Sequence, residues 1–251
     1  MHDKQVVLVT GANQGIGLQI AKDLAAAHFT VLVGSRDPKR GEDAAKTIDG
    51  DARAIQLDVT DEALIAAAAE RIRTEFGRLD VLVNNAAISN TRWADGMTLD
   101  EYARSAVASA VSLDEVRAVW ETNVFGPLAV FQAMLPLLRA APHASVVNVS
   151  SAVGSLTLNA DPAFEWRRAF NPAYAASKTA LNAMTLAMAI EMEPAGIKVN
   201  AVSSGFTRTN LNRYEGTESV EEGAREAVRL ALLGPDGPTG MFSSSAGPLP
   251  W

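Results

Sequence analysis

The chain has 251 residues, of which 48% are hydrophobic and 20% charged, a length that suits one α/β domain with a large core. Its formal net charge of −7 leaves no basic surplus to neutralise phosphates, which argues against a nucleic-acid partner. The lack of cysteine excludes disulfides, thiolate metal ligands and cysteine nucleophiles. The scattered histidines disfavour a metal site or a Ser-His-Asp triad; they are His2, His28 and His143.

Apolar, β-branched runs alternate along the chain with longer alanine-rich stretches of helical period. Strands are predicted at Gln5–Thr10, Thr30–Val33, Ala52–Leu57, Leu79–Asn84, Ala144–Ser150 and Lys198–Ser203, with an edge strand at Gly240–Ser243. Helices are predicted at Gly15–Ala27, Arg40–Ile48, Asp61–Phe76, Leu113–Leu138, Pro172–Met192 and Ser219–Leu233. Asp61 stands in a capping position, and Pro127 and Pro136 are expected to disturb the helix that contains them. This alternation predicts an α/β fold of the Rossmann type, a doubly wound parallel sheet with helices on both faces.

Two connections are too long for the short loops of such a fold. They are Ile88–Ser112, after the fourth strand, and Gly154–Asn171, before the helix at Pro172. Both leave the carboxyl ends of strands, where ligands bind in open α/β sheets, so we expect substrate-side insertions near 88–112 and 154–171. Their aromatic residues are candidate walls of a substrate pocket: Trp93, Tyr102, Phe164, Trp166 and Phe170. No repeat or linker divides residues 1–251, which favours a single domain.

No run approaches the roughly 18 apolar residues that a membrane-spanning helix needs. The first residues lead directly into a predicted strand and show no targeting pattern. The sequence therefore predicts a soluble, cytoplasmic enzyme with no membrane partner.

The first predicted strand ends in a glycine-rich turn, and a helix follows at once. The turn reads Gly11-Ala12-Asn13-Gln14-Gly15-Ile16-Gly17. Glycines in this context leave room for a pyrophosphate against main-chain N–H groups and the positive end of the helix. The pattern therefore predicts a dinucleotide site rather than a purely structural turn.

The end of the second strand bears on which dinucleotide binds. An acid there suits the ribose hydroxyls of NAD, whereas an arginine suits the 2′-phosphate of NADP. This chain has Ser35 at the strand end, Arg36 next and Asp37 one position later. We therefore expect NADP(H), with NAD(H) the less favoured cofactor; the alternative is that Arg36 is a solvated loop charge.

The third and fourth strands end in further candidate contacts. Asp58 could accept a hydrogen bond from an adenine amino group, and a helix-capping role together with Asp61 is an equal alternative. The fourth strand ends in Asn84-Asn85-Ala86-Ala87, whose small residues let the backbone approach a ligand.

Tyr174 and Lys178 lie four residues apart on a predicted helix, downstream of Ser150 and Ser151. Residues at this spacing share one helix face, about 5–6 Å apart at Cβ. A cation held there is expected to lower the pKa of the tyrosine, which would then exchange a proton near neutral pH.

These motifs, taken together and in this order, resemble the short-chain dehydrogenase/reductase superfamily, in its branch of single-domain enzymes of about 250 residues. The resemblance spans essentially the whole chain and is similar in detail to the carbonyl-reductase group. It is carried by Thr10–Gly17, Asp58, Asn84–Ala86, Asn123 in Glu121-Thr122-Asn123-Val124-Phe125-Gly126, Ser151, Tyr174, Lys178 and the run Asn200–Thr209.

The resemblance implies a role for each matching residue. Tyr174 would be the general acid and base, Lys178 would tune it and bind the nicotinamide ribose, and Ser151 would hold the substrate oxygen. Asn123 would bend its helix around a water that relays protons to Lys178. The implied cofactor contacts are Gly11, Asn13, Gln14, Gly15, Ile16, Gly17, Arg36, Asp58, Val59, Asn85, Ala86, Tyr174, Lys178, Gly205, Thr207 and Thr209.

The chain departs from the family pattern at two positions. Ala87 replaces the usual glycine after Asn-Asn-Ala, and Ser204 replaces the usual proline before Gly205. The interval from Ser151 to Tyr174 is also longer than usual and precedes the helix by which tetrameric members pair. Self-association is therefore left open between a monomer and a homodimer or tetramer.

The function expected from the sequence is an NADPH-dependent reductase that transfers hydride to an aldehyde or ketone and runs reversibly as an alcohol dehydrogenase. Its partner would be a small carbonyl or alcohol substrate, fairly apolar and aryl-bearing if the aromatic residues form the walls. One alternative is a non-catalytic NADP-binding sensor, and another is an enzyme that reduces an imine or chiefly oxidises secondary alcohols. No metal site is expected.

Overall fold

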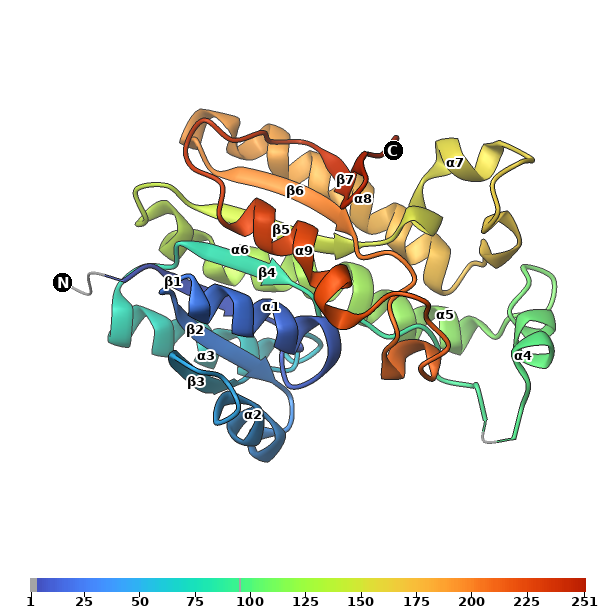
Figure 1. The fold of residues 1–251 in the computed structure, drawn as a ribbon, viewed down its shortest axis with the longest axis horizontal. Helices are drawn as coiled ribbons and strands as arrows, with labels where there is room; N and C mark the ends of the chain where they lie inside the picture. Colours follow the sequence, from blue (N-terminus) through green and yellow to red (C-terminus); the bar gives the residue numbers. More distant parts are fainter. Residues whose placement is uncertain (1–3, 95) are drawn as a thin grey trace.

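One sheet of eight strands forms the centre of the computed structural model, which describes residues 4–94 and 96–251 (Figure 1). The strands are β1 (Val6–Val9), β2 (Thr30–Ser35), β3 (Asp51–Gln56), β4 (Val81–Asn84), β5 (Ser145–Ser150), β6 (Lys198–Ser203), β7 (Phe242–Ser244) and β8 (Gly247–Pro248). Their order is β3-β2-β1-β4-β5-β6-β7-β8, and only β8 runs antiparallel to its neighbour. The strand order reverses between β1 and β4, which creates the crevice where such sheets bind ligands.

Helices cover both faces of the sheet, which confirms the predicted doubly wound α/β fold. They are α1 (Gly15–Ala26), α2 (Pro38–Ala45), α3 (Glu62–Phe76), α4 (Leu99–Ser105), α5 (Leu113–Trp120), α6 (Gly126–Arg139), α7 (Leu156–Ala160), α8 (Tyr174–Met192) and α9 (Val220–Ala231). Helices α1, α2 and α9 pack on one face, and α3, α6 and α8 pack on the other. Short 3₁₀ turns lie at Ala152–Gly154, Arg167–Ala169, Glu193–Ala195 and Asn210–Asn212.

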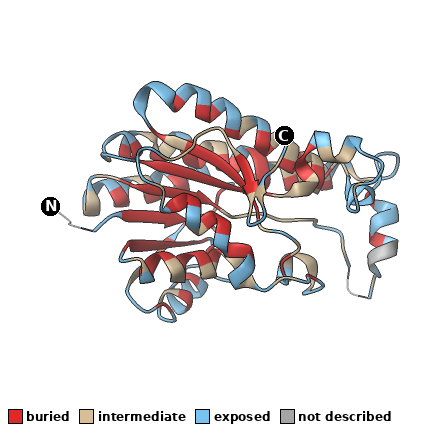
Figure 2. Cartoon of the chain, turned by 45° about the horizontal axis from the view of Figure 1, so that its top comes forward, coloured by how far each residue is buried: buried red, intermediate tan, exposed pale blue. Residues whose placement is uncertain are grey.

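The strands are buried along most of their length (Figure 2). Every residue of β1, β2, β4 and β5 is buried, because helices cover both sides of these strands. This burial explains why their sequences are nearly continuous apolar runs rather than alternating patterns. The two core clusters, one on each face, fix the sheet that positions the strand ends.

Capping residues set several helix boundaries. The Asp61 carboxylate accepts from the main-chain N–H groups of Ala63 and Leu64, which confirms its predicted capping position. Asp37 caps α2 and Ser219 caps α9 in the same manner. Each cap satisfies amides that the helix leaves free. Helices α3 and α9 begin where the sequence predicts, whereas α2 begins two residues before the predicted Arg40, because Asp37 caps it.

The helical region from Leu113 to Arg139 is disturbed around Asn123, where the resemblance implied a bend. A π-helical turn over Glu121–Phe125 separates α5 from α6. Pro127 follows this turn almost directly and has no N–H to continue the helical bonds there, and Pro136 is accommodated inside α6. The observed disturbance thus lies just before Pro127, whereas Pro136 does not interrupt α6.

The two long connections form a lobe beyond the carboxyl ends of the strands, with α4 in one and α7 in the other (Figure 1). The first residue of the second connection, Gly154, is attached to α8, because its carbonyl oxygen accepts from the Thr179 hydroxyl at 2.8 Å. Gly154 packs so tightly on α8 that a Cβ atom there would lie 2.8 Å from Lys178 Cβ. Neither short helix was predicted from the sequence.

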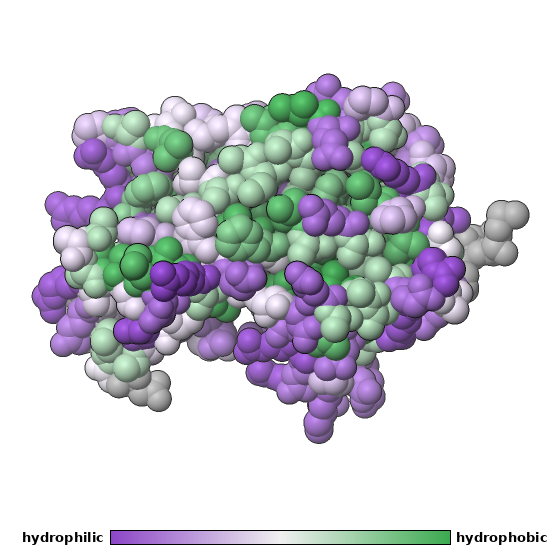
Figure 3. Space-filling model, turned by 180° about the vertical axis from the view of Figure 1, so that it is seen from behind, coloured by the Kyte–Doolittle hydropathy of each residue, from purple (hydrophilic) through white to green (hydrophobic). Residues whose placement is uncertain are grey.

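Hydrophobic residues gather across the middle of the face covered by α3, α6 and α8 (Figure 3). Helix α8 exposes Leu186 and Ile190 there, with 38% and 60% of their surfaces accessible. Among the described residues, no helix is long and apolar enough to cross a membrane. The exposed apolar surface of this face lies away from the strand ends at which the long connections gather.

Candidate active site

The glycine-rich turn after β1 is locked against the end of β4. The Thr10 hydroxyl accepts from the main-chain N–H groups of Asn85 and Ala86, both at 3.0 Å. The Asn85 amide donates back to the Thr10 carbonyl oxygen at 2.9 Å. A Cβ atom on Gly17 would lie 2.3 Å from Asn85 Nδ2, so only glycine permits this approach. The two strand ends therefore form one rigid turn beside the start of α1.

The N-terminus of α1 is open to an anion. In this fully described helix, no side chain caps the first-turn amides and no acidic residue lies in the first turn. Helices α2, α3 and α9, in contrast, each carry a side-chain cap. Free N–H groups and the helix dipole at such an end favour a phosphate or pyrophosphate.

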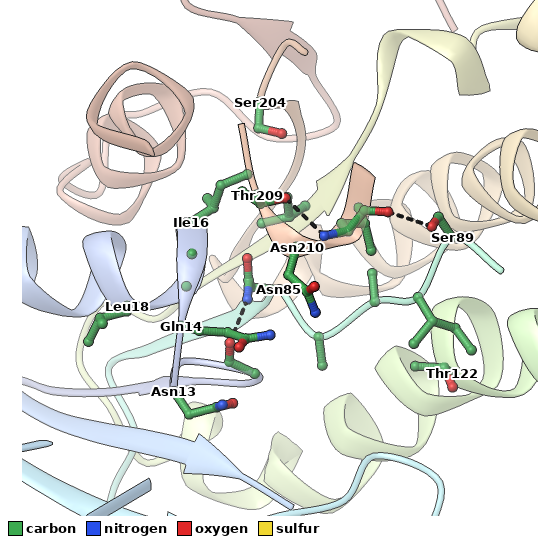
Figure 4. Close-up of a pocket in the computed structure, with 18 of the residues that line it drawn as sticks. Asn13, Gln14, Ile16, Leu18, Asn85, Ser89, Thr122, Ser204, Thr209 and Asn210 are labelled. Atoms are coloured by element: carbon green, nitrogen blue, oxygen red, sulfur yellow. Dashed lines mark hydrogen bonds between the residues drawn. The ribbon is translucent and has the colours of Figure 1, made fainter. Parts of the chain in front are cut away.

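A cavity of about 870 Å³ runs from this turn to the start of α8. Figure 4 shows Asn13, Gln14 and Ile16 on one side of it and Ser89 and Thr122 on the other, with Asn85 between them. The predicted site residues that line it are Gly11, Asn13, Gln14, Gly15, Ile16, Gly17, Arg36, Asp58, Val59, Asn85, Ala86, Tyr174, Lys178 and Thr209. Four predicted residues are not part of its lining: Asn123, Ser151, Gly205 and Thr207.

Charged residues at the end of β2 line the cavity. Arg36 is exposed, and Arg40 lies on the first turns of α2. The Asp37 carboxylate accepts from the Arg40 main-chain N–H at 3.1 Å as the cap of α2. Because Asp37 is engaged by its helix, the guanidinium groups of Arg36 and Arg40 are the charged groups at this strand end that are available to an anionic ligand.

The Asp58 side chain is hydrogen-bonded within the turn that follows β3. Its Oδ1 accepts from the main-chain N–H and the hydroxyl of Thr60, at 3.0 and 2.8 Å. Asp61, and not Asp58, caps α3. Asp58 and Val59 both line the cavity, so the carboxylate edge that Thr60 leaves free faces the space where an adenine amino group is expected.

Tyr174 is the first residue of α8, and Lys178 lies one turn further along it. The Lys178 side chain is buried, and its Nζ donates to the Val149 carbonyl oxygen at 2.8 Å. The same Nζ lies 5.7 Å from the centroid of the Tyr174 ring. The helix thus places a phenol and an amine on one face, as the spacing predicted.

The pKa values of this pair differ from the expectation. Burial raises the pKa of Tyr174 to about 12, and a side-chain hydrogen bond with Ser151 only partly opposes this shift. Burial also lowers the pKa of Lys178 to about 7. The expectation that Lys178 lowers the pKa of Tyr174 is therefore wrong for this structure. Desolvation outweighs the cation, which is itself close to losing its proton at neutral pH.

The two adjacent serines have separate partners. The Ser150 hydroxyl is buried and donates to Asn182 Oδ1 at 2.6 Å, so it is directed into α8. Ser151 is the serine that influences the pKa of Tyr174, whereas Ser150 is the one that is part of the cavity lining. The choice of Ser151 over Ser150 stays a prediction.

Asn123 lies within the π-helical turn and is fully buried. Its Oδ1 accepts from the Ile88 N–H at 2.9 Å, and its Nδ2 donates to the Ile88 carbonyl oxygen and to Ser177 Oγ. The Ser177 hydroxyl in turn donates to the Tyr174 carbonyl oxygen at 2.6 Å. Asn123 therefore ties the strand-end segment after β4 to the first turn of α8. Sequence reasoning did not identify Ser177, although it directly precedes Lys178.

The segment after β6 approaches the glycine turn through Thr209. The Thr209 methyl carbon would lie 3.5 Å from a Cβ atom placed on Gly15. Gly205 has a positive φ of 69°, and a Cβ atom there would collide with the Glu218 carboxylate. The Thr207 hydroxyl is buried and donates to the Ser204 carbonyl oxygen at 2.6 Å. Of these predicted residues, Thr209 faces the cavity, while Gly205 and Thr207 shape the loop that carries it.

The aromatic residues of the long connections divide into two groups. Trp93 lines the cavity, and Tyr102 stacks behind it with ring centroids 5.2 Å apart. Trp166 packs instead against Phe206 at 5.1 Å, and neither Trp166, Phe164 nor Phe170 is part of the cavity lining. Of the five candidate walls, the structure brings only Trp93 to the cavity. It adds Arg213, Leu211 and Ser89, which were not predicted.

Comparisons with known proteins agree with this arrangement. The sequence profile described as short chain dehydrogenase matches residues 5–219. The (+)-neomenthol dehydrogenase of Arabidopsis thaliana is 34% identical over 293 residues, covering 94% of this chain and 95% of that protein. The structure of salutaridine reductase from Papaver somniferum is similar with a TM-score of 0.81 and 29% identity, covering 96% and 100% of the two chains. A gluconate 5-dehydrogenase from Burkholderia cenocepacia J2315, solved with NADP and tartrate, has a TM-score of 0.78 and 26% identity, covering 96% and 92%.

Proposed function

This chain belongs to the short-chain dehydrogenase family of oxidoreductases, and we propose that it reduces an aldehyde or ketone with NADPH, with Tyr174 as the general acid. The observation that carries the proposal is the position of Tyr174, with Lys178 one turn away on the same helix. Tyr174 lies at one end of a cavity whose other end is an uncapped helix N-terminus beside a glycine turn. A proton donor and a phosphate-binding turn in one cavity suit dinucleotide-dependent reduction.

The residues around the cavity fit a dinucleotide. The free amides at the start of α1 suit its pyrophosphate. Because Gly17 has no side chain and packs closely on Asn85, a pyrophosphate can approach the main chain of the turn. Arg36 supports a preference for NADP(H), because a guanidinium binds a 2′-phosphate well and Asp37 is held by its helix. When bound, the nicotinamide would supply the hydride, and the chain's own groups supply position and charge.

Tyr174 would donate its proton to the carbonyl oxygen during reduction and accept one in the reverse direction. The raised pKa of Tyr174 keeps the phenol protonated near neutral pH, which is the state that a proton donor needs. The Ser151 hydroxyl would share the stabilisation of negative charge that develops on the substrate oxygen. Such a preorganised donor is often worth about 3–4 kcal/mol.

Lys178 would supply the proton that restores Tyr174 and bind the nicotinamide ribose. Its pKa of about 7 places the amine close to equilibrium between its two protonation states at neutral pH. Asn123 would position this group indirectly, since it fixes the first turn of α8 through Ser177. Thr209 would hold the carboxamide of the nicotinamide, next to the start of α1.

A non-catalytic NADP sensor is the second candidate function. It is disfavoured because the chain retains Asn123, Ser151, Tyr174 and Lys178 together, which binding alone does not require. A small carbonyl compound or alcohol is the proposed partner, and a cytoplasmic location stays a prediction from the sequence.

The test is the loss of NADPH absorbance with a panel of small and aryl-bearing aldehydes and ketones, repeated with NADH. Turnover with NADPH well above that with NADH is the expected result. Preference for NADH would retain the reductase and overturn the cofactor preference. Tight NADPH binding without turnover of any carbonyl compound would favour the sensor.

A further inference from the structure

The guanidinium of Arg213 lies over the ring of Trp93, with Cζ 4.4 Å from the ring centroid. Its Nη2 donates to the main-chain carbonyl oxygens of Trp93 and, at 3.0 Å, Ala94. Close by, the Ser89 hydroxyl donates to the Leu211 carbonyl oxygen at 2.7 Å. The segment after β6 and the segment after β4 are therefore joined at the cavity, and both Arg213 and Trp93 line it.

A buried platform holds the Trp93 ring in place. Tyr102 stacks on it at 5.2 Å with only 7° between the ring planes. The Tyr102 hydroxyl donates to the buried Glu115 carboxylate at 3.4 Å, and the Trp93 indole N–H donates to the Met97 carbonyl oxygen at 2.9 Å. Because the ring is fixed on its far side, the cation stacked on its near side is preorganised rather than mobile.

Arg213 has no acidic partner among the residues that the structure describes. Both hydrogen bonds of Arg213 use Nη2, so its Nε and Nη1 groups have no acceptor among the described residues. A guanidinium cannot lose its charge at physiological pH, so these donors suit an anionic acceptor.

The acidic residues that line the cavity lie toward its other end. Asp37 and Asp58 follow β2 and β3, where the adenosine is expected, and each is engaged by its own turn or helix. Hydrogen bonds with its own backbone N–H and with the Ser219 side chain lower the pKa of Glu221, and the charge of Lys22, on α1, adds a smaller shift in the same direction. Among the described residues, the end of the cavity near Trp93 therefore has a cation with no carboxylate in the cavity lining beside it.

We propose that Arg213 is a specificity-determining residue that binds a carboxylate on the carbonyl substrate. The inference rests on the proposed reductase function and narrows its substrate class. Ile88 and Leu211 supply apolar surface in the cavity lining, and Arg213 supplies one fixed positive charge. This combination suits an apolar or aryl carbonyl compound that also carries an acid, such as a formylbenzoate. The neutral ester of the same compound would fit the apolar surface and leave the cation unused.

The experiment compares 4-formylbenzoate with its methyl ester as substrates for NADPH-dependent reduction. The wild type is expected to show a kcat/KM about tenfold or more higher for the acid, the size of a charge-assisted hydrogen bond. Arg213→Gln should bring the ratio of acid to ester close to one; this ratio is the measure, because the variant also removes the bonds to Trp93 and Ala94. Arg213→Lys should keep part of the ratio. Arg92→Gln, an exposed arginine outside the cavity lining, is the matched control and should behave as the wild type.

A second measurement uses the unaltered protein. Benzoate should inhibit reduction of the ester competitively against the ester, and benzamide at the same concentration should not. An acid-to-ester ratio near one in the wild type, or equal inhibition by both compounds, would overturn the proposal.

The remaining outcomes separate two failures. If Arg213→Gln lowered kcat/KM equally for acid and ester, Arg213 would only hold the two loops together. That result would overturn the proposal. Turnover of the ester in that case would leave the reductase function standing. Turnover of neither compound nor of any other carbonyl would overturn the reductase function, and the specificity proposal with it.

Discussion

Asn171 Oδ1 accepts a hydrogen bond from the Tyr174 main-chain N–H at 2.8 Å, so the proposed acid is the residue at which α8 begins. The Trp120 indole N–H donates to the Pro172 carbonyl oxygen at 3.0 Å and holds the same approach to the helix. The position of Tyr174 is thus set by Asn171, on the connection before α8, and by Trp120 of α5. Ser151, which follows β5, influences the pKa of Tyr174.

Replacing Asn171 with alanine should disturb this position. Loss of a capping side chain typically destabilises a protein by about 1 kcal/mol. We expect Asn171→Ala to lower the free energy of unfolding by that amount and also to lower kcat. Urea unfolding and steady-state kinetics check both. Ser219→Ala, which removes the cap of α9, is the control: it should lose similar stability and keep kcat.

Tyr174→Phe should retain NADPH binding and lose most turnover. The hydroxyl matters when charge develops on the substrate, and general acid catalysis is typically worth about 10²–10⁴-fold. Fluorescence titration with NADPH and measurement of kcat check the two halves. A kcat in Tyr174→Phe equal to the wild type would exclude Tyr174 as the acid.

Arg36→Ala should weaken NADPH binding much more than NADH binding. Only NADPH carries the 2′-phosphate, and loss of a charge-assisted contact of this kind typically weakens binding about tenfold or more. The two KM values, measured with one substrate, give the comparison. Lys39→Ala removes a nearby positive charge that pairs with Asp43 and is not part of the cavity lining, so its two KM values should stay in the wild-type ratio. Equal losses for both cofactors in Arg36→Ala would make Arg36 a bystander.

Lys178 should make stability depend on pH in a defined window. In the unfolded chain its amine titrates near 10.5, whereas burial lowers the pKa to about 7 in the folded protein. Between these values the unfolded chain binds more protons, so the contribution of Lys178 to the free energy of unfolding rises with pH. Lys178→Met removes this contribution. The difference in free energy of unfolding, wild type minus Lys178→Met, should therefore increase from about pH 7 to pH 9.

Measurement by urea unfolding at several pH values tests this sign. A difference that stays flat or falls over the window would show that Lys178 keeps an ordinary pKa. Tyr174 acts in a separate window, because its pKa is raised from 10 to about 12 and its effect on stability begins above pH 10.

His28→Gly should stabilise the protein. His28 follows the end of α1 with a positive φ of 69° and is exposed, and the Phe29 N–H reaches back to the Leu24 carbonyl oxygen at 3.1 Å. Glycine adopts this left-handed conformation without the penalty of a Cβ atom, for a gain of about 0.5–1 kcal/mol. Thermal and urea unfolding measure it. His28→Ala, which removes the imidazole and keeps the Cβ atom, should give no gain.

Local patterns were sufficient to predict most of the fold. The buried strands are short apolar runs, and Asp61 and Ser219 mark helix starts within a residue of those observed. The resemblance implied a bend at Asn123, but local patterns could not predict that Asn123 bonds to Ile88, 35 positions earlier. The sequence contains the asparagine but not the contact that it makes.

In the candidate site, too, features within one element were predictable from the sequence, whereas contacts between distant residues were not. The glycine turn and the Tyr174–Lys178 pair follow from spacing within one element each. The contact of Arg213 with Trp93 joins residues 120 positions apart, and no local pattern announces it. The sign of the Tyr174 shift was also out of reach, because desolvation is a property of packing and not of sequence spacing.

The connection between Gly154 and Asn171 is fastened at both ends to the helix that it precedes. Gly154 packs on Lys178 and accepts from Thr179, while Asn171 caps Tyr174. The intervening residues can therefore be lengthened, shortened or exchanged without moving the phenol, because a longer loop adds only a slowly growing closure entropy. None of the described residues of this segment lines the cavity, so changes there can accumulate while the proton-transfer chemistry stays inherited.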